Sequence, residues 1–277
     1  MNRYMLLLAW EMDRFGRLYG ALLLAVLLSQ TGGVLWFAYR YMNSIREKMD
    51  RDSLTAAEYA VRAGRTSFAE YTASLWFMGP IALVAAALLL YAFLIWYREW
   101  YGKSTFVCRL LLLPASRMNI YLAKLVALSL FVLGFVAFEL LLLPLLNLLF
   151  HSVIPGELIQ PLTLGEIVRN HPLLPEFVPR HFIQFVFYYL TGLTGTAVLF
   201  TAILLERSFR LKGAAAGLVY ALGSALLFLS PYLAALLGYM DYFYPNEILL
   251  LLMAAGLLTF SGALGLASYL LNNNVSV

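Results

Sequence analysis

Residues 97–124 read YREWYGKSTFVCRLLLLPASRMNIYLAK and separate two long apolar runs of the chain. The segment contains one acid, Glu99, against five basic residues, which are Arg98, Lys103, Arg109, Arg117 and Lys124. A short basic loop between two membrane spans is typical of the cytoplasmic side of a bilayer. The segment therefore predicts that the chain leaves the membrane here and then returns into it.

The same segment contains the pattern of a short helix. Apolar residues recur at helical spacing over 104–112, which predicts an amphipathic helix lying along the membrane surface. Pro114 ends this helix because proline cannot donate a hydrogen bond to the preceding turn, and Ser116 is placed to cap the next one. A short surface helix with an apolar face suits the docking of a soluble partner.

The composition indicates an all-α integral membrane protein. Of the 277 residues 62% are hydrophobic and only 12% are charged, whereas soluble domains have roughly 25% charged residues. Several apolar stretches exceed the ~20 residues that a helix needs to cross a bilayer. The net charge of +4 is modest and comes from the loops, so we expect no nucleic-acid partner. The single cysteine, Cys108, excludes an internal disulfide.

Hydropathy predicts a single transmembrane domain with six spans. The stretch 2–16 before the first span has two interpretations: an interfacial helix with Glu11 on its polar face, or the frayed start of that span. The predicted spans cover about 18–39, 75–97, 121–146, 182–205, 213–230 and 247–271.

Two longer polar segments separate the spans. Residues 40–72 mix acids and bases and predict a solvated helical excursion that breaks near Gly64. Residues 151–180 are rich in proline, and the capping-box spacing of Thr163 and Glu166 predicts a helix that begins at Thr163. The three histidines lack the spacing of metal ligands, so we interpret them as surface or interfacial residues and expect no metal site; they are His151, His171 and His181.

The distribution of basic residues predicts the orientation. Basic residues outnumber acids at the N-terminus, in 98–124 and in 206–212, while the remaining segments contain slightly more acids than bases. Since short basic loops stay in the cytoplasm, both termini should be cytoplasmic. The six basic residues of 40–72 oppose this assignment, but the acids of that segment offset them.

Four side chains in the spans are candidates for a transport pathway. Glu139 is one of them, because a charged residue within a span is costly and is a functional candidate by default. The alternative is a structural Glu that is protonated or hydrogen-bonded to a neighbouring helix. Tyr188, Thr191 and Thr194 give the fourth span a mildly polar face. That face could line a pathway or pack against another helix.

One motif in the basic segment is misleading. Gly102-Lys103-Ser104-Thr105 reads like the end of a P-loop, but the required earlier glycine is replaced by Tyr97 and an apolar span precedes it in place of a strand. We therefore expect that this chain binds no nucleotide or other cofactor and has no catalytic residues. If ATP is used, another polypeptide binds it.

The basic segment also resembles a known family. Glu99, Gly102, the leucine run into Leu113-Pro114-Ala115-Ser116-Arg117, then Ile120 and Lys124 are similar to the intracellular loop of ABC transporter permeases of the type-2 exporter class. The likeness covers this segment and the six-span layout, and elsewhere rests on hydropathy and spacing alone. It implies an N-terminal interfacial "elbow" helix, and re-entrant or surface helices between spans five and six.

The resemblance also implies a function. The chain would be the permease subunit of an ATP-driven exporter in the cell membrane, paired with a soluble ATPase and with a second permease subunit, identical or different. Alternatives are a secondary transporter, a membrane protein without a transport role, or an intramembrane enzyme. An intramembrane enzyme would need paired acids or histidines within its spans, and Glu139 has no such second residue. The residues expected at the ATPase contact are Glu99, Gly102, Phe106, Arg109, Leu110, Pro114 and Arg117.

Overall fold

The computed structural model describes residues 3–53, 55–100, 116–179, 181–239 and 243–273. The regular elements of these ranges are helical, apart from one isolated bridge between Thr66 and Ile159. In chain order they are α1 (Arg3–Asp52), α2 (Ala56–Ala63), α3 (Phe68–Thr72), α4 (Leu75–Trp100), α6 (Arg117–Val153), η1 (Gly156–Leu158), α7 (Leu164–Asn170), α8 (Leu174–Phe177), α9 (Phe182–Leu236) and α10 (Pro245–Asn273).

The described part of the chain has six helical segments long and apolar enough to cross a membrane. This confirms the predicted fold class: the protein is an all-α polytopic membrane protein. By length and composition the segments are Tyr4–Asp52, Leu75–Arg98, Arg117–Val153, Phe182–Phe209, Leu211–Leu236 and Asn246–Asn273.

The chain divides into two compact units. The first unit comprises Met1–Arg14, Leu89–Leu130 and His181–Val277, and the second comprises Phe15–Leu88 and Phe131–Arg180. Helices α1, α4 and α6 therefore contribute residues to both units, whereas α9 and α10 belong to the first. Each contact described below lies within one unit.

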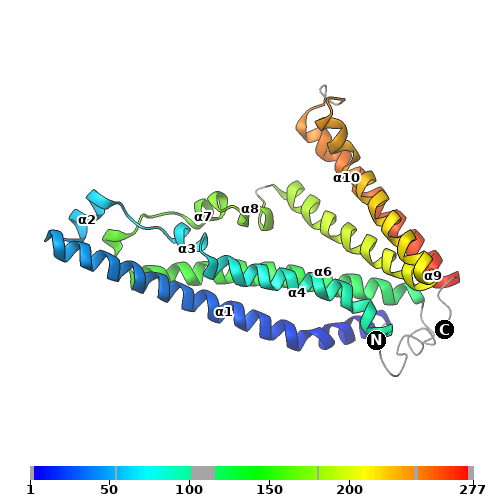
Figure 1. The fold of residues 1–277 in the computed structure, drawn as a ribbon, viewed down its shortest axis with the longest axis horizontal. Coiled ribbons are helices and arrows are strands. Elements are labelled where there is room, and N and C mark those ends of the chain that lie inside the picture. Colours follow the sequence, from blue (N-terminus) through cyan, green and yellow to red (C-terminus); the bar gives the residue numbers. More distant parts are fainter. Residues whose placement is uncertain (1–2, 54, 101–115, 180, 240–242, 274–277) are drawn as a thin grey trace. The chain divides into compact units, whose positions relative to one another are not determined.

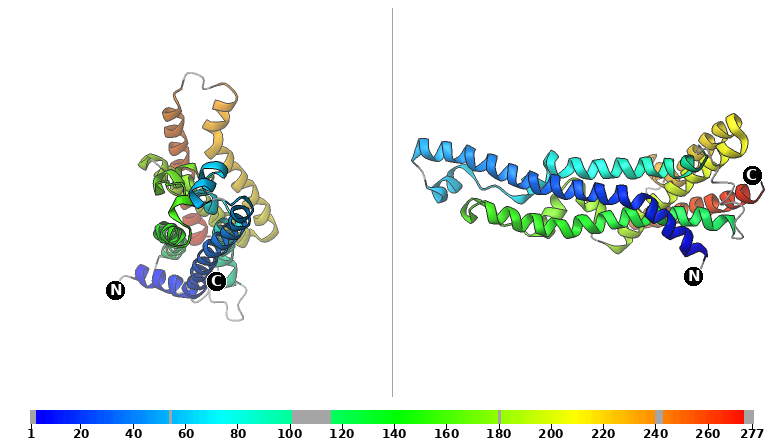
Figure 2. Two further views of the ribbon diagram at one scale, coloured as in Figure 1. Left: turned by 90° about the vertical axis from the view of Figure 1, so that its left-hand side faces the viewer. Right: turned by 90° about the horizontal axis from the view of Figure 1, so that it is seen from below.

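In the second unit α1 packs beside α6 (Figures 1 and 2). The Tyr19 hydroxyl of α1 donates to the Phe131 carbonyl of α6 at 3.0 Å. Further along both helices, the rings of Phe37 and Phe150 lie 6.1 Å apart. Since the residue numbers rise together along the contact, the two helices run parallel.

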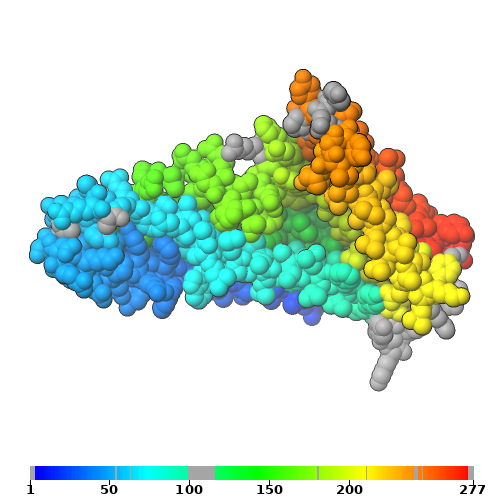
Figure 3. Space-filling model, turned by 45° about the horizontal axis from the view of Figure 1, so that its top comes forward, coloured from blue at the N-terminus to red at the C-terminus, as the bar shows by residue number. Residues whose placement is uncertain are grey.

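The short elements of the second unit pack against one another. The Thr66 amide donates to the Leu158 carbonyl at 2.9 Å, and the Gln160 amide donates to the Thr66 carbonyl at 2.8 Å. In Figure 3 the light blue residues of α2 and the green residues between η1 and α8 lie next to one another on one face. The two polar segments, 40–72 and 151–180, therefore fold together.

The predicted helix start at Thr163 is confirmed. Its side chain accepts from the Glu166 amide, and the Glu166 carboxylate accepts from the Thr163 amide at 2.8 Å. The Thr163 amide and the Thr163 hydroxyl both donate to the Glu166 carboxylate, which holds the pKa of this exposed carboxyl below its usual range. The predicted break near Gly64 is also confirmed, because α2 ends at Ala63 and Gly64 has a φ of 90°, a left-handed conformation that glycine adopts without steric cost.

The first part of the predicted helical excursion is a direct continuation of the first span, because α1 runs unbroken to Asp52. Residues such as Arg, Glu, Lys and Met propagate a helix well, and Ile45 is buried, which fixes one face of the extension. The charged residues between Arg46 and Asp52 are exposed, as expected for a solvated helix.

The start of the chain is also part of α1, because no break separates residues 3–16 from the first span. Leu7 packs with Ile120 and Ala123 of α6. Glu11 lies one turn further along the same face and is 3% exposed, so it is not on a solvated face as the sequence pattern suggested. Whether these first turns lie along the membrane surface remains a prediction.

In the first unit α9 reverses direction between its two apolar segments. A Cβ added to Gly213 would lie 2.1 Å from the Leu205 carbonyl oxygen, and one added to Gly217 would lie 2.7 Å from the Ala202 oxygen. In a straight helix, residues eight positions apart are ~12 Å apart. The predicted loop at 206–212 is therefore the tight turn of a helical hairpin, whose arms touch because these glycines have no side chain.

The end of α9 also differs from its prediction. The fifth span was expected to stop near Ser230, but α9 continues through Pro231 to Leu236. Helix α10, which packs beside α9, begins at Pro245. Residues 240–242 of the connection lie outside the described part of the chain, and the re-entrant or surface helices that the family resemblance implies between spans five and six stay a prediction.

Candidate functional site

The segment expected to contact an ATPase lies mostly outside the described residues. This applies to Gly102, Phe106, Arg109, Leu110 and Pro114, and the side chain of Glu99 is likewise not described. The two helix ends that flank the segment are described, however. The last turns of α4 and the first turns of α6 therefore form the candidate site.

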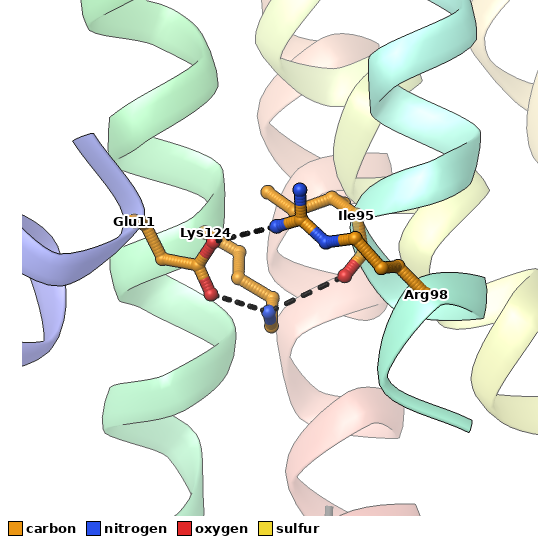
Figure 4. Close-up of polar contacts among 4 residues, drawn as sticks. All are labelled: Glu11, Ile95, Arg98 and Lys124. Carbon is orange, nitrogen blue, oxygen red and sulfur yellow. Dashed lines mark hydrogen bonds and ion pairs between the residues drawn. The ribbon is translucent and has the colours of Figure 1, made fainter. Parts of the chain in front are cut away.

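Three charged side chains meet at this site (Figure 4). The Lys124 ammonium of α6 donates to the Glu11 carboxylate of α1 at 2.6 Å and approaches the Ile95 carbonyl of α4 at 3.4 Å. The Arg98 guanidinium, in the last turn of α4, lies 3.8 Å from the second Glu11 oxygen. We call Glu11, Arg98 and Lys124 the charged cluster; it joins α1, α4 and α6.

The charged cluster corrects the interpretation of Lys124 as a loop cation. Lys124 lies within α6 and its side chain is fully buried. A buried ammonium must be paired and hydrogen-bonded to persist, and Glu11 supplies the opposite charge. The Trp96 ring adds a cation–π contact, with its centre 5.4 Å from the Lys124 nitrogen.

Further contacts tie the same helix ends to α9 and α10. The Arg117 guanidinium of α6 donates to the Leu271 carbonyl near the end of α10 at 2.7 Å, where the partial negative charge of a helix C-terminus favours a cation. The Tyr97 hydroxyl of α4 donates to the Glu206 carboxylate of α9, and the Arg207 guanidinium lies 4.8 Å from the centre of the Tyr97 ring. Both ends flanking 101–115 are thus anchored within the first unit.

An aromatic layer lies next to the charged cluster. Trp96 and Tyr121 each contact the Phe200 ring edge-on, with both pairs of ring centres 5.8 Å apart. The buried Tyr121 hydroxyl donates to the Ala197 carbonyl at 2.8 Å. Because all three rings are buried or nearly so, α4 and α6 meet α9 through a close-packed contact.

A second polar group lies in the second unit, around Gln30. The Gln30 amide nitrogen of α1 donates to both Glu139 oxygens of α6, at 3.2 and 3.3 Å, and to the Phe77 carbonyl of α4 at 3.3 Å. The Tyr71 hydroxyl of α3 donates to the Gln30 carbonyl at 2.6 Å. We call Gln30, Tyr71, Phe77 and Glu139 the Gln30 junction.

Glu139 is buried in this junction, with 8% of its surface exposed. Among the described residues no Lys or Arg forms an ion pair with it. The hydrogen bond between helices, one of the two interpretations of Glu139, is therefore present. A role for Glu139 in cargo handling stays a prediction.

A small cavity lies beside Glu139. Its volume is about 20 Å³, which is room for about one water molecule. No polar atom faces it, so Glu139 contributes only carbon atoms to its lining. Residues of α4, α6, α7 and α8 enclose it, among them Ile81, Phe135, Val168, Leu174 and Phe177.

The other pathway candidates belong to the first unit. Tyr188 is 42% exposed and Thr194 is 4% exposed, while the Thr191 hydroxyl donates to the Phe187 carbonyl of its own helix at 2.8 Å. They belong to the first unit and Glu139 belongs to the second, so a pathway shared by the four candidates stays a prediction.

His171 was interpreted as a surface or interfacial residue, and the structure shows that it does not lie at the surface. It is 6% exposed, whereas His151 and His181 are exposed. The His171 ring packs edge-on against Phe77, with ring centres 5.9 Å apart, and both of its nitrogens are hydrogen-bonded. The burial has a physical cause: α7 folds back onto α3, and the imidazole supplies the polar contacts between them.

Gln30 was also missed at the sequence level, although a lone amide in an apolar span is a recognisable signal for a bond between helices. No such signal exists for Glu11 and Lys124, which are far apart in the chain.

Comparison with known proteins found no match to a family model, to a curated protein or to a solved structure.

Proposed function

We propose that this chain is the permease subunit of an ATP-driven exporter of the type-2 ABC class, with residues 101–115 as its contact with a soluble ATPase. The observation that best supports this proposal is the anchoring of both helix ends that flank this segment. The charged cluster and the Arg117 and Tyr97 contacts hold the end of α4 and the start of α6 against α1, α9 and α10.

The physical argument concerns the transmission of motion. A partner that pushes on a loop moves the spans only if the loop is held stiffly to the helices that must move, since a loosely attached loop would absorb the displacement. Packed interiors are stiff and transmit strain, and the flanking turns here are packed and paired across helices. A segment of the same length on frayed helix ends could not transmit the motion in this way.

The rest of the proposal follows from the sequence. The chain would lie in the cell membrane with both termini in the cytoplasm, because the short basic segments favour that side. ATP hydrolysis would take place on the partner, and a second permease subunit, identical or different, would complete the pathway. The apolar spans favour a hydrophobic cargo over a strongly charged one.

A pair of substitutions tests the contact. An apolar anchor in a protein interface carries more of the affinity than a charge at its rim, so we expect Leu110→Asp to weaken binding to the ATPase far more than Arg109→Ala. The cause is that the new carboxylate must lose its water without gaining a partner. The measurement is copurification with a candidate soluble ABC ATPase, together with the stimulation of its hydrolysis.

The control is correct membrane insertion, checked by the yield and elution profile of each variant in detergent. Normal binding and stimulation by a correctly inserted Leu110→Asp variant would remove 101–115 as the coupling element. Transport driven by an ion gradient in vesicles that lack any ATPase would favour the secondary transporter instead.

A further inference from the structure

The hydrogen bonds of His171 determine its protonation state in the folded protein. Its Nε2 lies 3.0 Å from the Thr72 carbonyl oxygen, which can only accept, so Nε2 carries a proton. Its Nδ1 lies 3.1 Å from the backbone nitrogens of both Leu173 and Leu174, which can only donate. Nδ1 is therefore an acceptor, and the buried imidazole is neutral.

These bonds connect two parts of the second unit. Thr72 is the last residue of α3, just before α4, whereas Leu173 is the N-cap of α8 and Leu174 is its first residue. The first amides of a helix have no partner within it, and Nδ1 supplies one for two of them. His171 thus both holds α7 to α3 and caps α8.

Helices α7 and α8 in turn close the cavity beside Glu139. Val168 of α7 and Leu174 and Phe177 of α8 form part of its wall, opposite residues of α4 and α6. Leu174 is also one of the two residues whose amides bind Nδ1. Release of the imidazole would therefore free the same backbone that places an apolar side chain in the cavity wall.

We propose that His171 is a proton-sensitive latch that keeps α7 and α8 closed over this apolar cavity and releases them on acidification. A second proton can add only at Nδ1. It converts this acceptor into a donor that faces two other donors, so the hydrogen bonds from the Leu173 and Leu174 amides are lost. Imidazole is the side chain that ordinarily gains its proton just below neutral pH.

The charged groups on the neighbouring elements do not stabilise a cationic imidazole. Glu70 of α3 accepts from the Thr66 hydroxyl, and Glu166 is held in its capping box at the far end of α7. Arg169 of α7 donates to the Gly165 carbonyl, and Glu176 of α8 is exposed. The face that α4 presents is the Phe77 ring, and in the described part of the chain His171 forms no ion pair.

Hydrogen exchange tests the latch without any assumption about transport. The full-length protein in lipid nanodiscs is exchanged at about pH 7.5 and about pH 5.5, and each peptide's rate is divided by its intrinsic rate at that pH. We expect the protection of a peptide covering 172–178 to fall at least about tenfold at the lower pH, because two hydrogen bonds are lost. A peptide from α2, which contains no histidine, should keep its protection.

Two variants complete the experiment. His171→Asn offers an amide oxygen in place of Nδ1 but does not titrate in this range, so its 172–178 peptide should stay protected at both pH values. His171→Ala should be unprotected at both. Equal protection of the wild-type peptide at the two pH values, or the same loss in His171→Asn, would overturn the proposal and leave His171 as a structural residue.

Discussion

Removing either partner of the buried Glu11–Lys124 pair should destabilise the protein strongly. At 2.6 Å and an effective dielectric constant of about 20, the attraction of the two charges is about 6 kcal/mol before any desolvation cost. Desolvation of the two ions offsets much of this attraction. The larger effect comes from breaking the pair, because the remaining charge is then buried without compensation, which typically costs about 3–5 kcal/mol.

The expected results form a double-mutant cycle. Lys124→Met and Glu11→Leu should each lower the free energy of unfolding by about 3–5 kcal/mol. The double variant should recover most of this loss, since replacing a buried pair by apolar residues of similar size is often neutral or stabilising. Arg98→Met is the matched control: its side chain is 34% exposed and lies 3.8 Å from Glu11, so we expect a loss below about 1 kcal/mol.

The assay is the apparent melting temperature of each purified variant in one detergent. A change of 1 kcal/mol moves the midpoint by about 2–4 °C in a protein of nearly this size, so each single variant should melt on the order of 10 °C lower. Single variants as stable as Arg98→Met would refute the argument. So would a double variant that loses as much as the two single variants together, because that result would mean that the charges do not interact.

Two further predictions concern the α9 turn and the Gln30 junction. Gly213→Ala should destabilise the purified protein by at least about 1–3 kcal/mol, because its Cβ would lie 2.1 Å from the Leu205 oxygen. The control is Gly223→Ala, whose Cβ would have nothing within 4 Å and which should be neutral or slightly stabilising. Equal melting temperatures of the two variants would contradict the helical hairpin. Glu139→Gln keeps an acceptor for Gln30 and should cost less than Glu139→Leu, which leaves the Gln30 amide with the Phe77 carbonyl alone and one buried N–H without an acceptor, at about 1–3 kcal/mol. Unchanged transport in Glu139→Gln would show that a charge at this position has no function.

The sequence of neighbouring residues determined where the chain forms helices. Six apolar stretches determined the all-α membrane fold, because a bilayer requires every backbone group to be satisfied within a helix. The capping box at Thr163 and the break at Gly64 were equally readable, since each depends on residues a few positions apart. Hydropathy could not determine where α1 and α9 end, because good helix formers continue a helix beyond the apolar stretch.

Only the tertiary structure decided which polar residues are buried and with which partners. Glu11 and Lys124, like Gln30 and Glu139, come from separate helices, and no local pattern records a contact made across the fold. Sequence reasoning therefore placed Lys124 in a loop and His171 among the surface or interfacial residues. The physical reason is that burial forces each polar group to find a partner, and the packing of the helices determines which partner is within reach.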